Sequence, residues 1–179
     1  MLDKLAQRGK INILLVLFLI LEIVAFPYFT GQLKSASGGF GMLDTSLFLR
    51  TDQIHQMVAA YGDAGRNIYA SDLLTADLLF PVVYALLLAA LIRYLFREIY
   101  PPADPKQRAV VLPFAAMAFD YAENITILAL LSAYPKPAAL LAGILPLLTA
   151  LKWLLVVGSF GIVLYAVIVY LKRSATRPA

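Results

Sequence analysis

The chain has 179 residues, 61% of them hydrophobic, and a formal net charge of +4. Its mean hydropathy of +0.80 and its four long apolar blocks exclude a soluble domain and predict an integral membrane protein. The basic residues stand at the ends of these blocks, where topology accounts for them, so we expect no nucleic-acid partner. With no cysteine and one histidine, the sequence excludes thiol chemistry and Cys- or His-rich metal sites, and we expect neither metal nor cofactor.

The first apolar block follows a basic start and contains a single charged residue, Glu22. A secretory signal peptide also has a basic start, but its apolar region is only about 7 to 15 residues long and holds no acid. The sequence therefore predicts a retained first transmembrane helix over about residues 11–30. A long connection follows, to about residue 71.

Within this connection, residues 51–61 are predicted to form a short amphipathic helix. Apolar residues recur there at i, i+3, i+4 and i+7 beside a polar face, and Gly62 follows as a stop signal. We expect this helix to lie on the membrane surface or to cap the bundle. Its apolar positions are Ile54, Met57, Val58 and Tyr61.

A second spanning helix is predicted over about residues 70–97. Only 15 residues separate Asp77 from Arg93, fewer than the roughly 20 that cross a bilayer, so Asp77 must lie inside the membrane. Pro81 and Tyr84 follow it at i+4 and i+7 on the same helix face. Because proline has no N–H, Pro81 leaves the carbonyl of Asp77 free for another partner.

The third apolar block, predicted to be a helix over about residues 109–133, holds three strongly polar side chains. Asp120, Glu123 and Asn124 stand at i, i+3 and i+4 and therefore share one face. An acid placed against lipid would cost roughly 2.5 to 3.5 kcal/mol. This face must therefore turn toward other helices or toward a wet cavity.

The last apolar block runs from residue 137 to residue 171 and contains one charged residue, Lys152. It is longer than one crossing requires. We therefore expect a short leading segment that ends near Pro146 and then a full spanning helix, the two together covering about residues 140–171. Trp153 is predicted to be an interfacial anchor.

The lysine and arginine residues of the connecting segments are unevenly distributed. Ten lie in the N-terminus, the second loop and the C-terminus, against four in the other two connections. The positive-inside rule then predicts that both termini are cytoplasmic. The sequence thus predicts an all-α, polytopic four-helix transmembrane bundle in the bacterial inner membrane, one domain over residues 1–179, with the amphipathic helix in the first extracytoplasmic connection. The ten are Lys4, Arg8, Lys10, Arg93, Arg97, Lys106, Arg108, Lys172, Arg173 and Arg177, and the four are Lys34, Arg50, Arg66 and Lys136.

The polar residues of the four predicted helices fall at similar depth. Counting ~1.5 Å per residue from the cytoplasmic end of each helix places them at ~18 to ~30 Å, in the outer half of the membrane. This predicts a polar pocket that opens outward, roofed by the connection of residues 30–71. Four carboxylates against one lysine should hold protons or attract a cation or an amine. The candidate ligand-binding or proton-sharing residues are Glu22, Asp77, Tyr84, Asp120, Glu123, Asn124 and Lys152.

Three interpretations of this pocket stay open, and they leave open whether the protein is an enzyme. In the first, it binds or acts on a lipid-like or amphiphilic small molecule from the membrane. In the second, the acids only join helices, in a non-catalytic subunit of a larger membrane complex or in a homo-oligomer, although intramembrane hydrogen bonds average only roughly 0.6 kcal/mol. In the third, two acids that share a proton hydrolyse an amide, as in an intramembrane aspartyl hydrolase.

Four short motifs resemble those of uncharacterised bacterial four-helix membrane proteins. The layout is also similar to the EXPERA superfamily of sterol isomerases and the sigma-2 receptor, with four helices, cytoplasmic ends and an acidic element after the first helix. This resemblance implies intramembrane acids that line a pocket for a sterol or a cationic amphiphile. The chain departs from the isomerases by lacking their histidine in the bundle. The motifs are Gly65-Arg66-x-x-Tyr69, Asp77-x-x-x-Pro81-x-x-Tyr84, Asp120-x-x-Glu123-Asn124 and Lys152-Trp153, and the acidic element is Leu43-Asp44.

Lipoprotein signal peptidases offer a second comparison. They are also four-helix membrane proteins, with two aspartates near the outer surface. Their asparagine-containing aspartate motifs are not found in this sequence.

Overall fold

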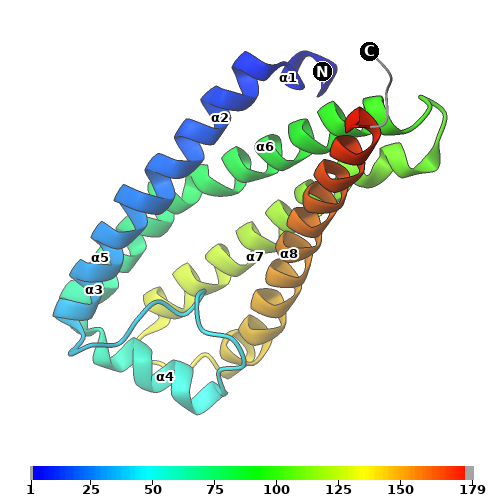
Figure 1. The fold of residues 1–179 in the computed structure, drawn as a ribbon. Coiled ribbons are helices and arrows are strands. Elements are labelled where there is room, and N and C mark those ends of the chain that lie inside the picture. The colour runs from blue at the N-terminus through cyan, green and yellow to red at the C-terminus, as the bar shows by residue number, and fades with distance from the viewer. Residues whose placement is uncertain (1, 176–179) are drawn as a thin grey trace.

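The structure is a computed structural model that describes residues 2–175, and no strand occurs among them. Four helical stretches are long and apolar enough to cross a membrane, in agreement with the predicted number. A short helix, α1 (Leu2–Leu5), precedes them. Helix α1 and the last turns of α8 lie at the same end of the bundle (Figure 1), as an even number of crossings requires. The four stretches are Arg8–Ala36, Gly62–Ile99, Pro105–Ala133 and Ala139–Ala175.

The first span is interrupted by a π-helical turn. It consists of α2 (Arg8–Ile20), the π-turn η1 (Leu21–Ala25) and α3 (Phe26–Ala36). In η1 the N–H of Phe26 reaches back five residues to the carbonyl of Leu21, and the next residue, Pro27, has no N–H to offer. Turns of this kind are rare and frequently occur at functional sites. Glu22 lies in this widened turn.

The connection after α3 folds back over the bundle and is held there by two tyrosines. The hydroxyl of Tyr61 donates to the carbonyl of Gly41 at 2.8 Å. The hydroxyl of Tyr69 accepts a hydrogen bond from the N–H of Leu43 at 3.0 Å and donates to the carboxylate of Asp44 at 2.5 Å. These hydrogen bonds hold the backbone around Asp44 in place on the bundle.

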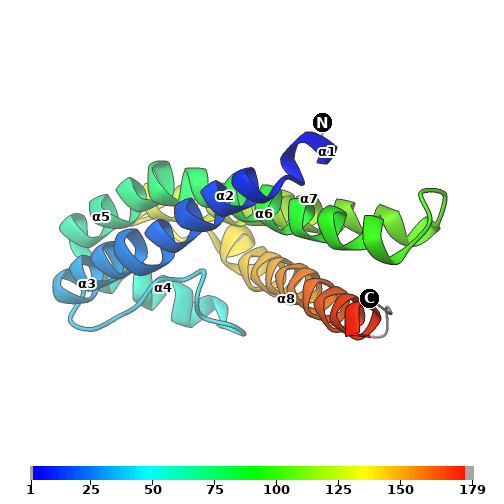
Figure 2. The same ribbon diagram turned by 45° about the horizontal axis from the view of Figure 1, so that its top comes forward.

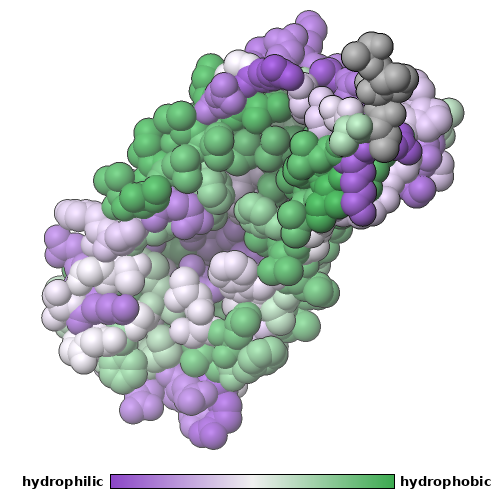
Figure 3. Space-filling view, viewed as in Figure 1, coloured by the Kyte–Doolittle hydropathy of each residue, from purple (hydrophilic) through white to green (hydrophobic). Residues whose placement is uncertain are grey.

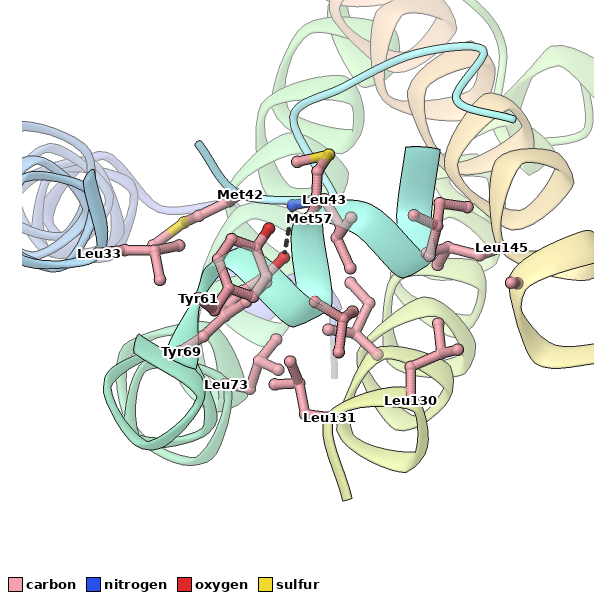
Figure 4. Close-up of a cluster of buried hydrophobic side chains, with 14 residues drawn as sticks. Leu33, Met42, Leu43, Met57, Tyr61, Tyr69, Leu73, Leu130, Leu131 and Leu145 are labelled. Atoms are coloured by element: carbon pink, nitrogen blue, oxygen red, sulfur yellow. Dashed lines mark hydrogen bonds between the residues drawn. The ribbon is translucent and has the colours of Figure 1, made fainter. Parts of the chain in front are cut away.

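Helix α4 (Thr51–Ala60) follows, and its buried side chains are Ile54, Met57 and Val58. These side chains join a buried apolar cluster that also contains Tyr61 and Tyr69 and draws on the first span, α7 and α8. Figure 4 shows this cluster, with the two tyrosines on the side of Leu33 and Leu73. It anchors the end of the bundle opposite α1.

The second span is longer than predicted because it starts at Gly62 rather than near residue 70. It contains α5 (Gly62–Leu74) and α6 (Ala76–Ile99), and the helix breaks at Thr75, whose φ and ψ are −124° and −86°. This break makes Asp77 a first-turn residue of α6. A carboxylate is favourable there because the helix N-terminus carries partial positive charge.

A 3₁₀ segment, η2 (Pro105–Val111), leads into α7 (Leu112–Ala133). Helix α8 (Ala139–Ala175) then runs without a break through Pro146, so the prediction of a separate leading segment is wrong. Proline removes one hydrogen bond from a helix, and the extensive packing of α8 against α7 and α6 compensates for that loss. Seen from the second direction, α8 runs at an angle to α6 and α7 (Figure 2), and its C-terminal turns still contact the end of α6, where Ala166 joins a buried cluster with Ile99.

Candidate functional site

A cavity of about 260 Å³ lies between the first span, α6, α7 and α8. Its walls combine acids from four different elements with one lysine and several aromatic rings. The polar part consists of Glu22 from η1, Asp44 from the connection, Asp77 from α6, Asp120 from α7 and Lys152 from α8. The rings are those of Phe18, Phe26, Phe80, Tyr84, Trp153 and Phe160.

The cavity opens on the side of the bundle. In the space-filling view a hollow with a hydrophilic floor lies between two hydrophobic flanks (Figure 3), which correspond to the first span and α8 in Figure 1. The rings of Phe18 and Phe160, from these two spans, belong to its wall. A molecule dissolved in the bilayer would therefore meet apolar surface first and carboxylates deeper in.

Asp77 and Asp120 are the two buried acids of the cavity wall. Asp77 is 6% exposed and forms no ion pair or side-chain hydrogen bond with any residue in the described part of the chain. Asp120 is 3% exposed, and the Nζ of Lys152 stands 3.9 Å from its Oδ1. The hydroxyl of Tyr84 lies beside Asp120 without good hydrogen-bonding geometry. Both carboxylates are thus available to a positively charged group.

Glu123 occupies a different environment although it is one turn away from Asp120 on the same helix. Its side chain is fully buried, pairs with the Nζ of Lys152 and accepts a hydrogen bond from the hydroxyl of Thr149. It does not belong to the cavity wall. Lys152 therefore neutralises Glu123 first and compensates Asp120 only in part.

Asn124 lies behind the cavity and ties α7 to α6. Its Nδ2 donates to the backbone carbonyl of Asp77 at 3.3 Å, which is the carbonyl that Pro81 was predicted to leave free. The Oδ1 of Asn124 is buried without a partner. This bond fixes the first turn of α6, and with it the position of the Asp77 carboxylate.

Asp44 was absent from the predicted site residues, although it lines the cavity. It reaches the cavity because Tyr69 holds its carboxylate and because the Nε1 of Trp153 donates to its backbone carbonyl at 3.1 Å. The position of Trp153 on α8 thus links the connection to the last span. The Leu43-Asp44 pair was the only sequence signal, since periodicity says nothing about an irregular segment.

Five of the seven predicted site residues line the cavity, and the other two, Glu123 and Asn124, are buried behind it. Among residues 2–175 no group of histidine, cysteine, aspartate or glutamate side chains has a geometry suited to a metal ion. The cavity wall is suited to an organic cation, because it combines four acids and six aromatic rings with one lysine that is already paired with Glu123. The five are Glu22, Asp77, Tyr84, Asp120 and Lys152.

Comparison of the chain with protein-family models, with curated proteins and with solved structures finds no match in any of the three.

Proposed function

We propose that this protein is a multi-pass protein of the bacterial inner membrane that binds the cationic head group of an amine-bearing amphiphile. The observation that carries the proposal is the pair of buried carboxylates, Asp77 and Asp120, on the wall of a cavity that opens between two hydrophobic flanks (Figure 3). A buried carboxylate without a full partner is costly. An ammonium group that enters the cavity removes that cost, so binding and charge compensation are the same event.

The aromatic wall supports an amine over a simple inorganic cation. Phe80 and Tyr84 stand in edge contact, with ring centroids 5.3 Å apart, and Phe80 also contacts Phe26 at 4.8 Å. A cation over such a ring face gains about 0.5 kcal/mol at exposed sites and about 2 kcal/mol when desolvated. An alkylammonium can use both the rings and the carboxylates, whereas a hydrated metal ion can use only the latter.

The size of the cavity supports a ligand that is only partly enclosed. At about 260 Å³ it is smaller than the roughly 300 to 1,000 Å³ of pockets that enclose a whole drug-sized molecule. The head group would occupy the cavity, and the apolar tail would leave between the first span and α8. This arrangement explains why the mouth is lined by apolar side chains.

The proposed orientation puts both termini in the cytoplasm and the cavity in the outer half of the membrane. The ten-to-four distribution of lysine and arginine supports it. In this orientation α4 is an amphipathic helix at the extracytoplasmic surface. A phosphatase that is active only in the periplasm should be inactive when fused to the C-terminus. An active fusion would show that the orientation is the opposite of the one proposed.

The subunit interpretation receives less support from the site. Acids that serve only to join helices should have their partners within the chain. Glu123 is such an acid, since it pairs with Lys152 and accepts a hydrogen bond from Thr149. Purification in mild detergent separates the two interpretations, because the subunit interpretation requires an obligate protein partner. The aspartyl hydrolase needs two acids that share one proton, and a peptide substrate cleaved by the purified protein would favour it.

The experiment that tests the proposal uses the purified full-length protein in detergent and compares hexadecylamine with hexadecanol. The two probes share a chain and differ in the charged head group. We expect the amine to raise the thermal unfolding temperature and the alcohol to have little effect. Asp120→Asn should weaken the amine response about tenfold in concentration, which corresponds to about 1.4 kcal/mol.

The matched control is Asp63→Asn, since the Asp63 side chain is 97% exposed and does not belong to the cavity wall. It should respond to the amine as the wild type does. Equal stabilisation by amine and alcohol, or an unchanged amine response in Asp120→Asn, would contradict the proposal.

A further inference from the structure

A second hollow lies at the other end of the bundle, where the last turns of α6, the η2 segment and α8 meet. It is a groove of about 540 Å³. None of its lining residues belongs to the acid-lined cavity.

The groove has an apolar floor and a polar rim. Phe96 and Gly161 contribute to its lining, and a Cβ built on Gly161 would meet no atom within 4 Å. At the rim, the hydroxyls of Tyr100 and Tyr165 are 2.9 Å apart, and the Nζ of Lys106 lies 4.6 Å from the centroid of the Tyr100 ring. Tyrosines gather in this way at the boundary between hydrocarbon and head groups.

The rim carries positive charge, which Lys106 contributes. Lys106, on η2, forms no ion pair with an acid of the described residues. The acid closest in the sequence, Asp104, has its Oδ1 engaged by the backbone N–H of Lys106 at 2.8 Å. This contrasts with Arg93, which is paired with Asp3 at 2.7 Å.

We propose that this groove binds an anionic phospholipid of the bilayer. Its phosphate would accept hydrogen bonds from the Nζ of Lys106 and the hydroxyl of Tyr165, and one acyl chain would lie on Phe96 over Gly161. The charge of the rim, the interfacial tyrosines and the open apolar floor each match one part of such a lipid. Basic pockets between transmembrane helices recognise anionic head groups in this way. The site does not depend on the ligand of the acid-lined cavity.

The test measures lipid binding to the purified full-length protein by native mass spectrometry. Phosphatidylglycerol and phosphatidylcholine with identical acyl chains are titrated in parallel, and we expect at least tenfold tighter binding of phosphatidylglycerol. Gly161→Phe fills the groove and should weaken phosphatidylglycerol binding at least tenfold. The matched control is Gly143→Phe, an exposed α8 position that also meets no atom within 4 Å and lies outside the groove, and it should bind as the wild type does.

A second variant tests the charge and does not depend on the fate of Gly161→Phe. Lys106→Gln should weaken phosphatidylglycerol binding about fivefold, the contribution of about one lysine near an anionic surface. Lys34→Gln, an exposed lysine of α3, should leave binding unchanged.

Equal binding of the two lipids, or equal loss in Lys106→Gln and Lys34→Gln, would overturn the proposal. The last measurement is competition between phosphatidylglycerol and inorganic phosphate. If millimolar phosphate displaced phosphatidylglycerol completely, the site would be one for free phosphate rather than for lipid, and the proposal would also fail.

Discussion

Asp120 and Glu123 lie one turn apart on α7 and share a helix face, yet the structure gives them opposite environments. Glu123 is fully buried and is held by Lys152 and Thr149. Asp120 borders a cavity, and its distance to the same lysine is 3.9 Å. One cation can thus pair with one acid and leave the neighbouring acid available to a ligand. In our interpretation Glu123 maintains the structure and Asp120 binds the ligand.

Removal of the shared cation should have the largest effect. Lys152→Met keeps an unbranched apolar stem but leaves the fully buried Glu123 without its partner. Breaking a buried pair in this way costs about 3 to 5 kcal/mol. We expect a marked fall in unfolding temperature, measured by thermal denaturation in detergent.

Lys34→Met is the matched control for Lys152→Met, because Lys34 is exposed on α3. It should unfold at the wild-type temperature. If both variants were equally stable, Lys152 would not stabilise Glu123, and the contrast between the two acids would lose its basis.

Glu123→Gln should have the second largest effect on stability. It removes the charge that Lys152 neutralises while keeping an acceptor for the hydroxyl of Thr149. Loss of one charged hydrogen-bond partner in a buried site costs about 1 to 3 kcal/mol. The same change releases Lys152 toward Asp120, so hexadecylamine should also bind less tightly. Unfolding and amine titration of the same sample measure both, and a fully stable variant would count against the structural role.

Asp120→Asn should give the reverse pattern. The carboxylate borders the cavity, and the amide keeps its shape, so stability should change by less than about 1 kcal/mol. Affinity for hexadecylamine should fall about tenfold. If Asp120→Asn unfolded easily but bound the amine normally, Asp120 would have the structural role that we assign to Glu123.

The smallest effect is expected for an acid in water, Asp52 on α4. The neighbouring Arg50 guanidinium donates to its carboxylate and lowers the pKa of Asp52 to about 2. Because the pKa is lower in the folded state, the pair stabilises the protein above about pH 4 and its contribution is lost as the pH falls toward 2. Asp52→Asn should therefore unfold slightly more easily than wild type at pH 6, and the difference should vanish near pH 2. A difference that grows at low pH would contradict this.

Much of the framework could be predicted from the sequence because it depends on local patterns. Long apolar blocks identified the four spans, and the missing N–H of Pro81 indicated a free carbonyl at Asp77, to which Asn124 donates. Helical spacing also placed Asp120 and Glu123 on one face. Each of these inferences needs only residues that are close in the chain.

The rest depends on contacts that local patterns do not contain. Periodicity does not reveal that Tyr69 and Trp153 bring Asp44 to the cavity, or that Lys152 lies against Glu123 rather than Asp120. The π-turn at Glu22 has no distinct composition apart from the proline that follows it. Pro146 suggested a helix end, but the packing of α8 on its neighbours kept the helix continuous.

The most direct test of the proposed function is a native mass spectrum of the protein titrated with hexadecylamine. The wild type is compared with the double variant Asp77→Asn and Asp120→Asn, in which both cavity carboxylates are replaced. We expect one amine per chain on the wild type and at least tenfold lower affinity in the double variant, with hexadecanol bound equally weakly by both. Equal amine occupancy on the two proteins would show that these carboxylates do not bind the amine, and the proposed function would be wrong.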